Sequence, residues 1–232
     1  MIALGRGGQP AATVELAELA AASHGEVVGL LRLAFAGQEN ARLGARYLAA
    51  WLASFEEDSV LLLARRGDVA VGLAVGTPEA READRYRTLR GAVLAALARR
   101  PWCALSPALL AMAWRRLAGG AAAAVEGGGC CWYLALLATH PNARGTGIGG
   151  LLLDRFENAG RRRGWRRASL HVLRDRPAAH RFYERAGWVP VAPAWPGRLR
   201  YEKDLAAGAG RGAAPRGYLP RPGIAVERRC VL

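Results

Sequence analysis

The 232-residue sequence predicts one mixed α/β domain that carries an insertion and a tail. Two observations predict this class. Short apolar runs of strand length occur at 60–64, 69–75 and 132–138, and longer segments such as 147–162 repeat their apolar residues at helical spacing. Hydrophobic residues make up 52% of the chain and charged residues 22%, which is enough apolar material for a sizeable core.

The N-terminal part is expected to begin with a flexible leader over 1–12 and a half-buried strand over 14–19. Ser23 and Glu26 have the spacing of a capping box, and an apolar stripe at helical spacing follows them. A second helix is predicted over 41–54. The two apolar runs 60–64 and 69–75 surround a Gly-Asp turn, which predicts an antiparallel hairpin.

Residues 78–128 are predicted to be a helical insertion between strands, with helical stretches at 79–99 and 105–118. Long insertions often form lids or binding surfaces. Three roles are open: a wall of the substrate pocket, a face lying on a membrane surface, and a helical pair packed on the core. The acidic residues Glu79, Glu82 and Asp84 would either meet a cationic amine or pair with nearby arginines.

The C-terminal part is predicted to alternate strands and helices again. After the 132–138 strand and the 147–162 helix, Pro177 is suited to open a further helix and Gly187 to end it. The predicted strands are 167–172, 188–191 and 198–205. Residues 206–232, rich in Ala, Gly, Pro and Arg, are expected to be a disordered tail outside the 13–205 domain.

A glycine-rich loop lies between the 132–138 strand and the 147–162 helix, with the sequence Arg144-Gly145-Thr146-Gly147-Ile148-Gly149. Free backbone amides at a helix N-terminus, together with the helix dipole, suit an anion such as a pyrophosphate. A tight strand-to-helix turn alone would also explain the glycines. The loop lacks the lysine of a P-loop. Gly145, Gly147 and Gly150 have the spacing of a dinucleotide fingerprint, but the predicted strand that follows does not end in an acidic residue, so that fingerprint fits poorly.

Residues 137–149 resemble the acyl-CoA-binding motif of the GNAT acetyltransferase superfamily, which has the form [QR]-x-x-G-x-[GA]. Residues 178–189 resemble the last conserved helix and strand of the same family. The resemblance is strong over 132–205, extends over 13–76, and is absent from 78–128 and the tail. It implies a GNAT-like central sheet, mixed but mostly antiparallel and twisted, flanked by helices and carrying the insertion between its third and fourth strands.

The resemblance also implies an N-acyltransferase that moves an acetyl group from acetyl-CoA to an amine of a small molecule, sugar or peptide, without a covalent enzyme intermediate. Tyr183 would be the general acid near the thioester sulfur. Arg176 stands where relatives often carry Asn, so it would reach a phosphate or point to solvent. The residues implied to bind the cofactor are Leu137, Ala138, Thr139, Arg144, Gly145, Thr146, Gly147, Ile148, Gly149 and Arg176.

No acidic residue lies on the 132–138 strand, so the general base is not evident. The candidates are Glu126, His140, His171 and, more weakly, Tyr133. His171 is the one placed on a strand near the expected cleft, although a lone strand histidine is commonly structural and water could relay the proton instead. Tyr183 would in turn be an ordinary packed aromatic without the family resemblance.

The net charge of +14 suggests a polyanion partner, but Lys203 is the only lysine and the arginines are dispersed. A general compositional bias explains this better than a nucleic-acid site. The four cysteines form no C-x-x-C pair, so neither a disulfide framework nor a metal site is expected. We expect a cytoplasmic protein with no transmembrane segment, and a homodimer stays open. A non-catalytic acyl-CoA sensor is the alternative function.

Overall fold

The computed structural model describes residues 24–35, 42–55, 58–99, 106, 130–195 and 197–206. The leader, the strand predicted at 14–19, the helix predicted at 105–118 and the tail lie outside these residues. In chain order the elements are α1 (His24–Ala34), α3 (Ala45–Ala53), β1 (Val60–Arg66), β2 (Val69–Pro78), α4 (Arg81–Thr88), α5 (Arg90–Arg99), β3 (Trp132–Thr139), the short η3 (Pro141–Ala143), α8 (Ile148–Arg162), β4 (Arg167–Leu173), α9 (Pro177–Arg185), β5 (Val189–Trp195) and β6 (Arg198–Asp204).

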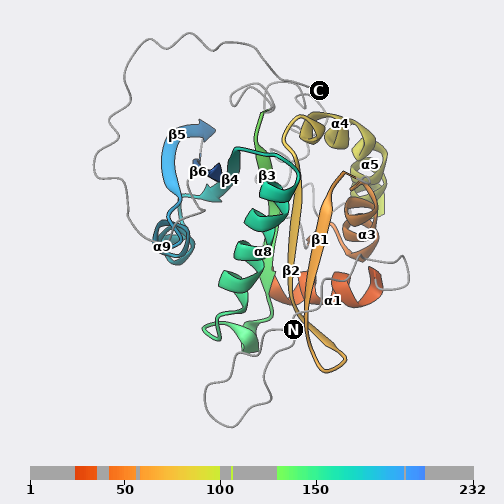
Figure 1. Ribbon diagram of the computed structural model, residues 1–232. Coiled ribbons are helices and arrows are strands. Elements are labelled where there is room, and N and C mark those ends of the chain that lie inside the picture. The colour runs from red at the N-terminus through yellow and green to blue at the C-terminus, as the bar shows by residue number, and fades with distance from the viewer. Residues whose placement is uncertain are drawn as a thin grey trace.

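The strands form one sheet with the order β1-β2-β3-β4-β6-β5. All neighbouring strands pair antiparallel except β3 and β4, which run parallel. The prediction of a mixed, mostly antiparallel sheet flanked by helices is therefore confirmed (Figure 1). The hairpin predicted around the Gly-Asp turn is the β1–β2 pair, and Gly67 at its tip has a positive φ of 59°.

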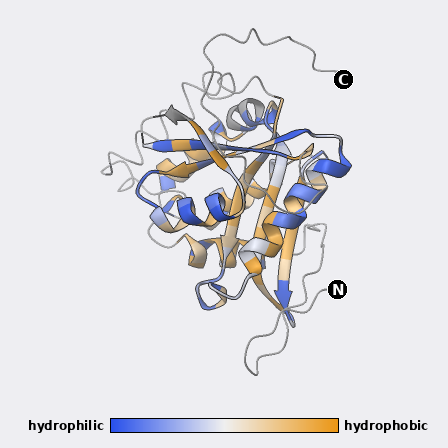
Figure 2. Cartoon of the chain, turned by 60° about the vertical axis from the view of Figure 1, so that its left-hand side comes forward, coloured by the Kyte–Doolittle hydropathy of each residue, from blue (hydrophilic) through white to orange (hydrophobic). Residues whose placement is uncertain are grey.

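Two hydrophobic clusters cover opposite faces of this sheet. One joins α1, α3 and α5 to the sheet through residues such as Leu31, Leu52 and Val93. The other packs α8 against the sheet through Phe156 and Leu152, and continues to β4 and β6. Figure 2 shows the corresponding pattern, with hydrophobic strands inside and hydrophilic faces on the outer helices.

Helix α8 approaches the sheet closely because β2 carries glycines where the two elements meet. A Cβ atom on Gly72 would lie 2.8 Å from Leu152, and one on Gly76 would lie 2.7 Å from Phe156. Neither distance is compatible with ordinary van der Waals contact. These glycines therefore fix the distance between α8 and the sheet, and with it the position of the glycine loop at the start of α8.

Strand β3 contains a bulge that changes its direction next to β4. Leu134 pairs with Gly76 of β2 and Leu136 pairs with Val75, so Ala135 is an extra residue without a partner. A bulge bends its strand and increases the local twist. Pairing between β3 and β4 is limited to Trp132 with Ala168 and Tyr133 with Ser169. The two strands thus diverge just where the bulge begins.

The sequence predicts a single helix over 79–99 in the first part of the insertion, and the structure differs from this prediction. This part forms two helices, α4 and α5, with Leu89 between them. Leu89 and Val93 are buried, and Val93 belongs to the cluster formed with α1 and α3. The first part of the insertion is therefore a pair of helices packed on the core.

The predicted capping box of α1 includes Ser23, which lies outside the described residues. The structure gives Glu26 a longer-range role. Its carboxylate accepts hydrogen bonds from the Ala70 backbone amide at 2.7 Å and from the Arg65 guanidinium at 2.5 Å. Glu26 thus ties α1 to the β1–β2 hairpin.

Candidate active site

The divergence of β3 and β4 opens a cavity of about 660 Å³. Residues 134–139 of β3 and 170–173 of β4 form its two sides, and the start of α9 lies at one end. Side chains of α1 and α3 also line it, on the face of the sheet opposite to α8. Beyond Tyr133, peptide groups of β3 that point toward β4 have no strand partner there, so they are available to an extended, amide-containing ligand.

The glycine loop has the backbone geometry of an anion site. Gly145 and Gly147 have φ values of 76° and 87°, a region that favours glycine. The backbone amide of Arg144 donates to Pro141 at 3.2 Å. In the described part of the chain, the amides of residues 145–149 donate to no other group. They lie at the N-terminal end of α8, a 15-residue helix, where the helix dipole favours negative charge.

The two arginines expected at the cofactor lie at the edge of this cavity. The Arg144 guanidinium donates a hydrogen bond to the carbonyl oxygen of Ala34 at 3.2 Å, near the C-terminal end of α1. Arg176 is the N-cap residue of α9, and its side chain is 3.7 Å from the exposed carboxylate of Asp175. Both arginines line the cavity, and both contacts are solvent-exposed and weak enough to exchange for a phosphate.

Tyr183 lies on α9 and lines the same cavity. Its ring packs against Phe182 and Trp188 at centroid distances of 5.0 and 6.1 Å. Burial raises the pKa of the Tyr183 phenol above its ordinary value of about 10, so the group stays protonated at neutral pH. Its hydroxyl forms no hydrogen bond with the residues that the structure describes, which leaves the proton available to a ligand in the cavity.

His171 lies on β4 and also lines the cavity. Its Nδ1 atom is 3.2 Å from the hydroxyl of Tyr133 on β3, so the pair spans the point where the strands separate. Burial, together with the positive charges of Arg200 and Arg198, lowers the pKa of His171 to about 4. The imidazole is therefore neutral at pH 7.

His140, another candidate base, lies at the end of β3 and takes part in the turn that follows. Its Nδ1 atom accepts a hydrogen bond from the backbone amide of Asn142 at 3.2 Å, as the N-cap of η3. That nitrogen is therefore occupied in a structural contact. Glu126, the remaining candidate, lies outside the described residues.

Residues 92–188 match the model of the acetyltransferase (GNAT) family. This segment of the chain is therefore similar to the GNAT acetyltransferase family. The matched range begins within α5. It therefore includes residues 92–128 of the insertion, in which the sequence motifs showed no resemblance to the family. No curated protein sequence matches the chain.

Solved structures share the GNAT fold with this chain. SsHAT superposes with a TM-score of 0.58 at 21% identity, covering 84% of this chain and 99% of that one. The PaiA N-acetyltransferase of Thermoplasma acidophilum, in complex with coenzyme A, has a TM-score of 0.52 at 13% identity, covering 83% and 99%. The ribosomal-protein-S18-alanine N-acetyltransferase of Escherichia coli has a TM-score of 0.51 at 12% identity, covering 90% and 99%. Identities this low establish the fold alone.

One buried ion pair beside the cavity was not predicted from the sequence. Glu79 and Arg200 are 121 positions apart, and the Arg200 guanidinium donates to both carboxylate oxygens of Glu79. Arg200 also donates to Glu202 at 2.8 Å, and Ser169 donates to Glu79 at 3.3 Å. Nothing in the local sequence signals a contact over this separation.

Two of the three acidic residues considered for amine binding are thus already partnered. Glu79 pairs with Arg200, and Glu82 pairs with Arg85 three positions along α4. The pairing of Glu82 follows the helical alternative that the sequence left open. The side chain of Asp84 lies outside the described part of the structure.

Metal and membrane features are also absent from the residues described here. Their His, Cys, Asp and Glu side chains form no group of three or more that would hold a metal ion. None of their helices has the length and apolar character needed to cross a bilayer.

Proposed function

We propose that this GNAT domain transfers the acetyl group of acetyl-CoA to the primary amine of a small molecule, sugar or peptide. The observation that supports this most is the divergence of β3 and β4. It opens one cavity that Tyr183 and His171 both line, and whose edge adjoins the unpaired amides of residues 145–149. A thioester donor with a diphosphate and an amide-rich arm matches these features.

The donor would bind through backbone groups. The amides of 145–149 and the dipole of α8 would hold the diphosphate, with Arg144 and Arg176 as nearby cations. The pantetheine arm would pair with the β3 edge along Leu137, Ala138 and Thr139, as a peptide strand adds to a sheet. The acetyl thioester would then lie between the two strands.

The reaction needs a neutral amine, a polarised carbonyl and a proton for the leaving thiolate. The amine nitrogen attacks the carbonyl carbon, and the tetrahedral intermediate releases coenzyme A as a thiolate. A free backbone amide of β3 would stabilise the developing oxyanion. Tyr183 would deliver the proton to sulfur, since its raised pKa keeps it in the acid form before the transfer.

His171 would take the proton that the amine loses, because its low pKa keeps the imidazole neutral. Its hydrogen bond with Tyr133 restricts how this can happen. If Nε2 is the basic atom, Nδ1 must carry the hydrogen and donate it to the Tyr133 oxygen. Tyr133 would then stabilise the imidazolium that forms. We further expect the enzyme to act in the cytoplasm, where thiols such as those of Cys130 and Cys131, which form no disulfide in the described residues, stay reduced.

The test is the release of coenzyme A thiol from acetyl-CoA in the presence of a panel of primary amines. Tyr183→Phe should lower turnover about 10²- to 10⁴-fold, the usual contribution of a general acid. Its affinity for coenzyme A should stay close to that of the parent protein. Phe182→Leu, a change in the neighbouring ring, serves as the control and should keep most of the activity.

Two results would contradict the proposal. If Tyr183→Phe turned over as fast as the parent, the acid role would be lost. If the protein bound coenzyme A but no amine in the panel released thiol, a non-catalytic acyl-CoA sensor would replace the enzyme.

A further inference from the structure

The part of the cavity on the α1 and α3 side of the sheet has an apolar wall. Leu31 of α1 and Phe35, which directly follows α1, contribute to it, as do Leu48 and Trp51 of α3. Trp51 is half-buried and packs edge-to-face against Phe55, with ring centroids 4.8 Å apart. A partly exposed aromatic ring held in place by a second ring is suited to contact an apolar group of similar size.

The charges that line the same cavity are mainly positive. Arg144, Arg176 and Arg198 line it, and Asp175 is the single carboxylate among the described lining residues. The Asp175 side chain is 76% exposed and lies beside Arg176. It therefore belongs to the rim of the cavity and not to its interior.

Two acidic residues outside the cavity lining, Glu79 and Glu202, are already ion-paired. Glu79 is 5% exposed at its side chain and is bound by Arg200, which also holds Glu202. Breaking a buried pair of this kind to free a carboxylate costs far more than a surface ion pair returns. In the described residues, no carboxylate inside the cavity is left to receive an ammonium group.

The charges and the apolar wall of the cavity predict which amines the site would accept and which it would exclude. A polyamine or aminoglycoside would bring a second ammonium into a positively charged cavity, where it would lose water and gain no carboxylate partner from the lining residues that the structure describes. An amine with one amino group has only to lose its proton, and the positive surroundings favour the neutral form. An apolar ring on that amine would lose water against Trp51 and Phe35.

We infer that the acceptor is a monoamine whose amino group is joined by a short linker to an apolar, ring-sized body. The inference rests on the proposed acetyl transfer and narrows its acceptor. Its basis is the pairing of an aromatic wall with a cavity interior that lacks a free carboxylate, as seen in the described residues.

The experiment compares kcat/KM for 2-phenylethylamine, ethylamine and spermidine, with acetyl-CoA at saturation and thiol release as the readout. We expect 2-phenylethylamine to exceed ethylamine by at least about tenfold and spermidine to be the poorest of the three. A preference for spermidine, or equal values for the two monoamines, would overturn the inference while leaving acetyl transfer intact. Thiol release with none of the three would overturn the inference, and acetyl transfer would fall with it only if the wider panel of primary amines also released no thiol while coenzyme A still protected the protein against heat.

Two variants of Trp51 give the same test within one protein. Trp51→Leu should lower kcat/KM for 2-phenylethylamine several-fold more than it lowers kcat/KM for ethylamine. Trp51→Glu places a carboxylate in the cavity wall and should raise the relative rate with spermidine. Leu94→Ala is the control, since Leu94 is 54% exposed on α5 and outside the cavity lining. If Trp51→Leu slowed all amines equally, the wall would not select the acceptor.

Discussion

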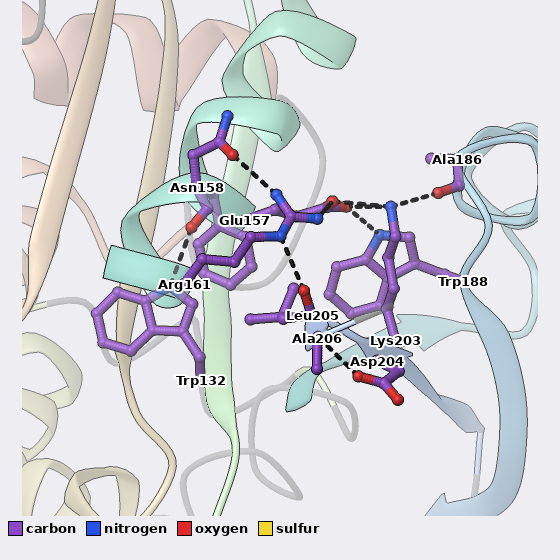
Figure 3. A network of polar contacts seen from close by, with 11 residues as sticks. Trp132, Glu157, Asn158, Arg161, Ala186, Trp188, Lys203, Asp204, Leu205 and Ala206 are labelled. Carbon is purple, nitrogen blue, oxygen red and sulfur yellow. Dashed lines mark hydrogen bonds and ion pairs between the residues drawn. The ribbon is translucent and has the colours of Figure 1, made fainter. Parts of the chain in front are cut away.

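The ammonium of Lys203 on β6 lies 2.7 and 2.8 Å from the two carboxylate oxygens of Glu157 on α8. Its third hydrogen bond, at 2.7 Å, goes to the carbonyl oxygen of Ala186 after α9. Figure 3 shows Glu157 at the centre of this network, where it also accepts from Trp188 and Arg161. The only lysine of the chain thus connects α8, β6 and the end of α9.

Lys203→Met should destabilise the protein by about 2–4 kcal/mol, because it leaves the buried Glu157 carboxylate without its closest cation. Chemical denaturation monitored by circular dichroism would measure the loss. Lys203→Arg should also destabilise, since a planar guanidinium does not reproduce three hydrogen bonds of a compact ammonium.

A double-mutant cycle provides the control for Lys203. In Glu157→Gln the amide oxygen can still accept from Trp188, so the combined variant with Lys203→Met should lose less stability than the two single losses together. Strict additivity would mean that the two side chains do not interact energetically.

Helix glycines at two positions should respond oppositely to alanine. Gly29 in α1 has open space around it, so Gly29→Ala should stabilise by up to about 1 kcal/mol through helix propensity. In Gly160→Ala the new Cβ would lie 2.6 Å from the Trp132 ring, and overpacking should cost about 1–3 kcal/mol. Thermal melts of both variants test this, and an equal shift in both would contradict the packing of α8 on Trp132.

The hairpin and the α8 segment were predictable because their signals are local. A Gly-Asp turn between two apolar runs fixes the β1–β2 pair, and the periodic apolar residues of α8 fix its buried face. The glycine loop was recognisable for the same reason. Its residues are consecutive, and their backbone conformation follows from their own identity.

The shape of the cleft was not predictable in the same way. It depends on the bulge at Ala135, a residue whose identity carries no turn or bulge signal. The Tyr133–His171 contact and the Glu79–Arg200 pair join segments separated by 38 and 121 positions. Such contacts are set by strand order and register, which local propensities do not determine.

The backbone amide of Gly149 offers a direct test of the anion site. Gly149 is in the first turn of α8, and its nearest neighbour to an added Cβ is Phe182 at 3.7 Å, which is ordinary contact distance. Gly149→Ala keeps the amide and Gly149→Pro removes it, while proline is tolerated in the first turn of a helix. The proline variant should bind coenzyme A about 10- to 100-fold more weakly, the loss of one hydrogen bond to a charged group.

Isothermal titration calorimetry with coenzyme A, and with pantetheine, which lacks the diphosphate, would measure this loss. The alanine variant should bind coenzyme A nearly as the parent does, and pantetheine affinity should be similar in all three proteins. Equal coenzyme A affinity in the proline and alanine variants would argue against diphosphate binding by this amide.

His171 should make the stability of the protein depend on pH. The ordinary pKa of histidine is 6.5, which applies to the unfolded chain, and the pKa of His171 in the fold is about 4. The unfolded chain therefore binds the proton first as the pH falls, so stability is complete above pH 6.5 and declines between about 6.5 and 4. The full loss is at most about 3 kcal/mol, and water at the partly exposed ring reduces it.

His171→Gln removes this proton-binding site and leaves the other histidines in place. Its melting temperature should fall less than that of the parent protein between pH 7 and pH 4.5, because the parent alone binds a proton at His171 on unfolding. Differential scanning calorimetry across this range measures the difference. Parallel pH curves for the two proteins would mean that the pKa of His171 is not lowered in the fold.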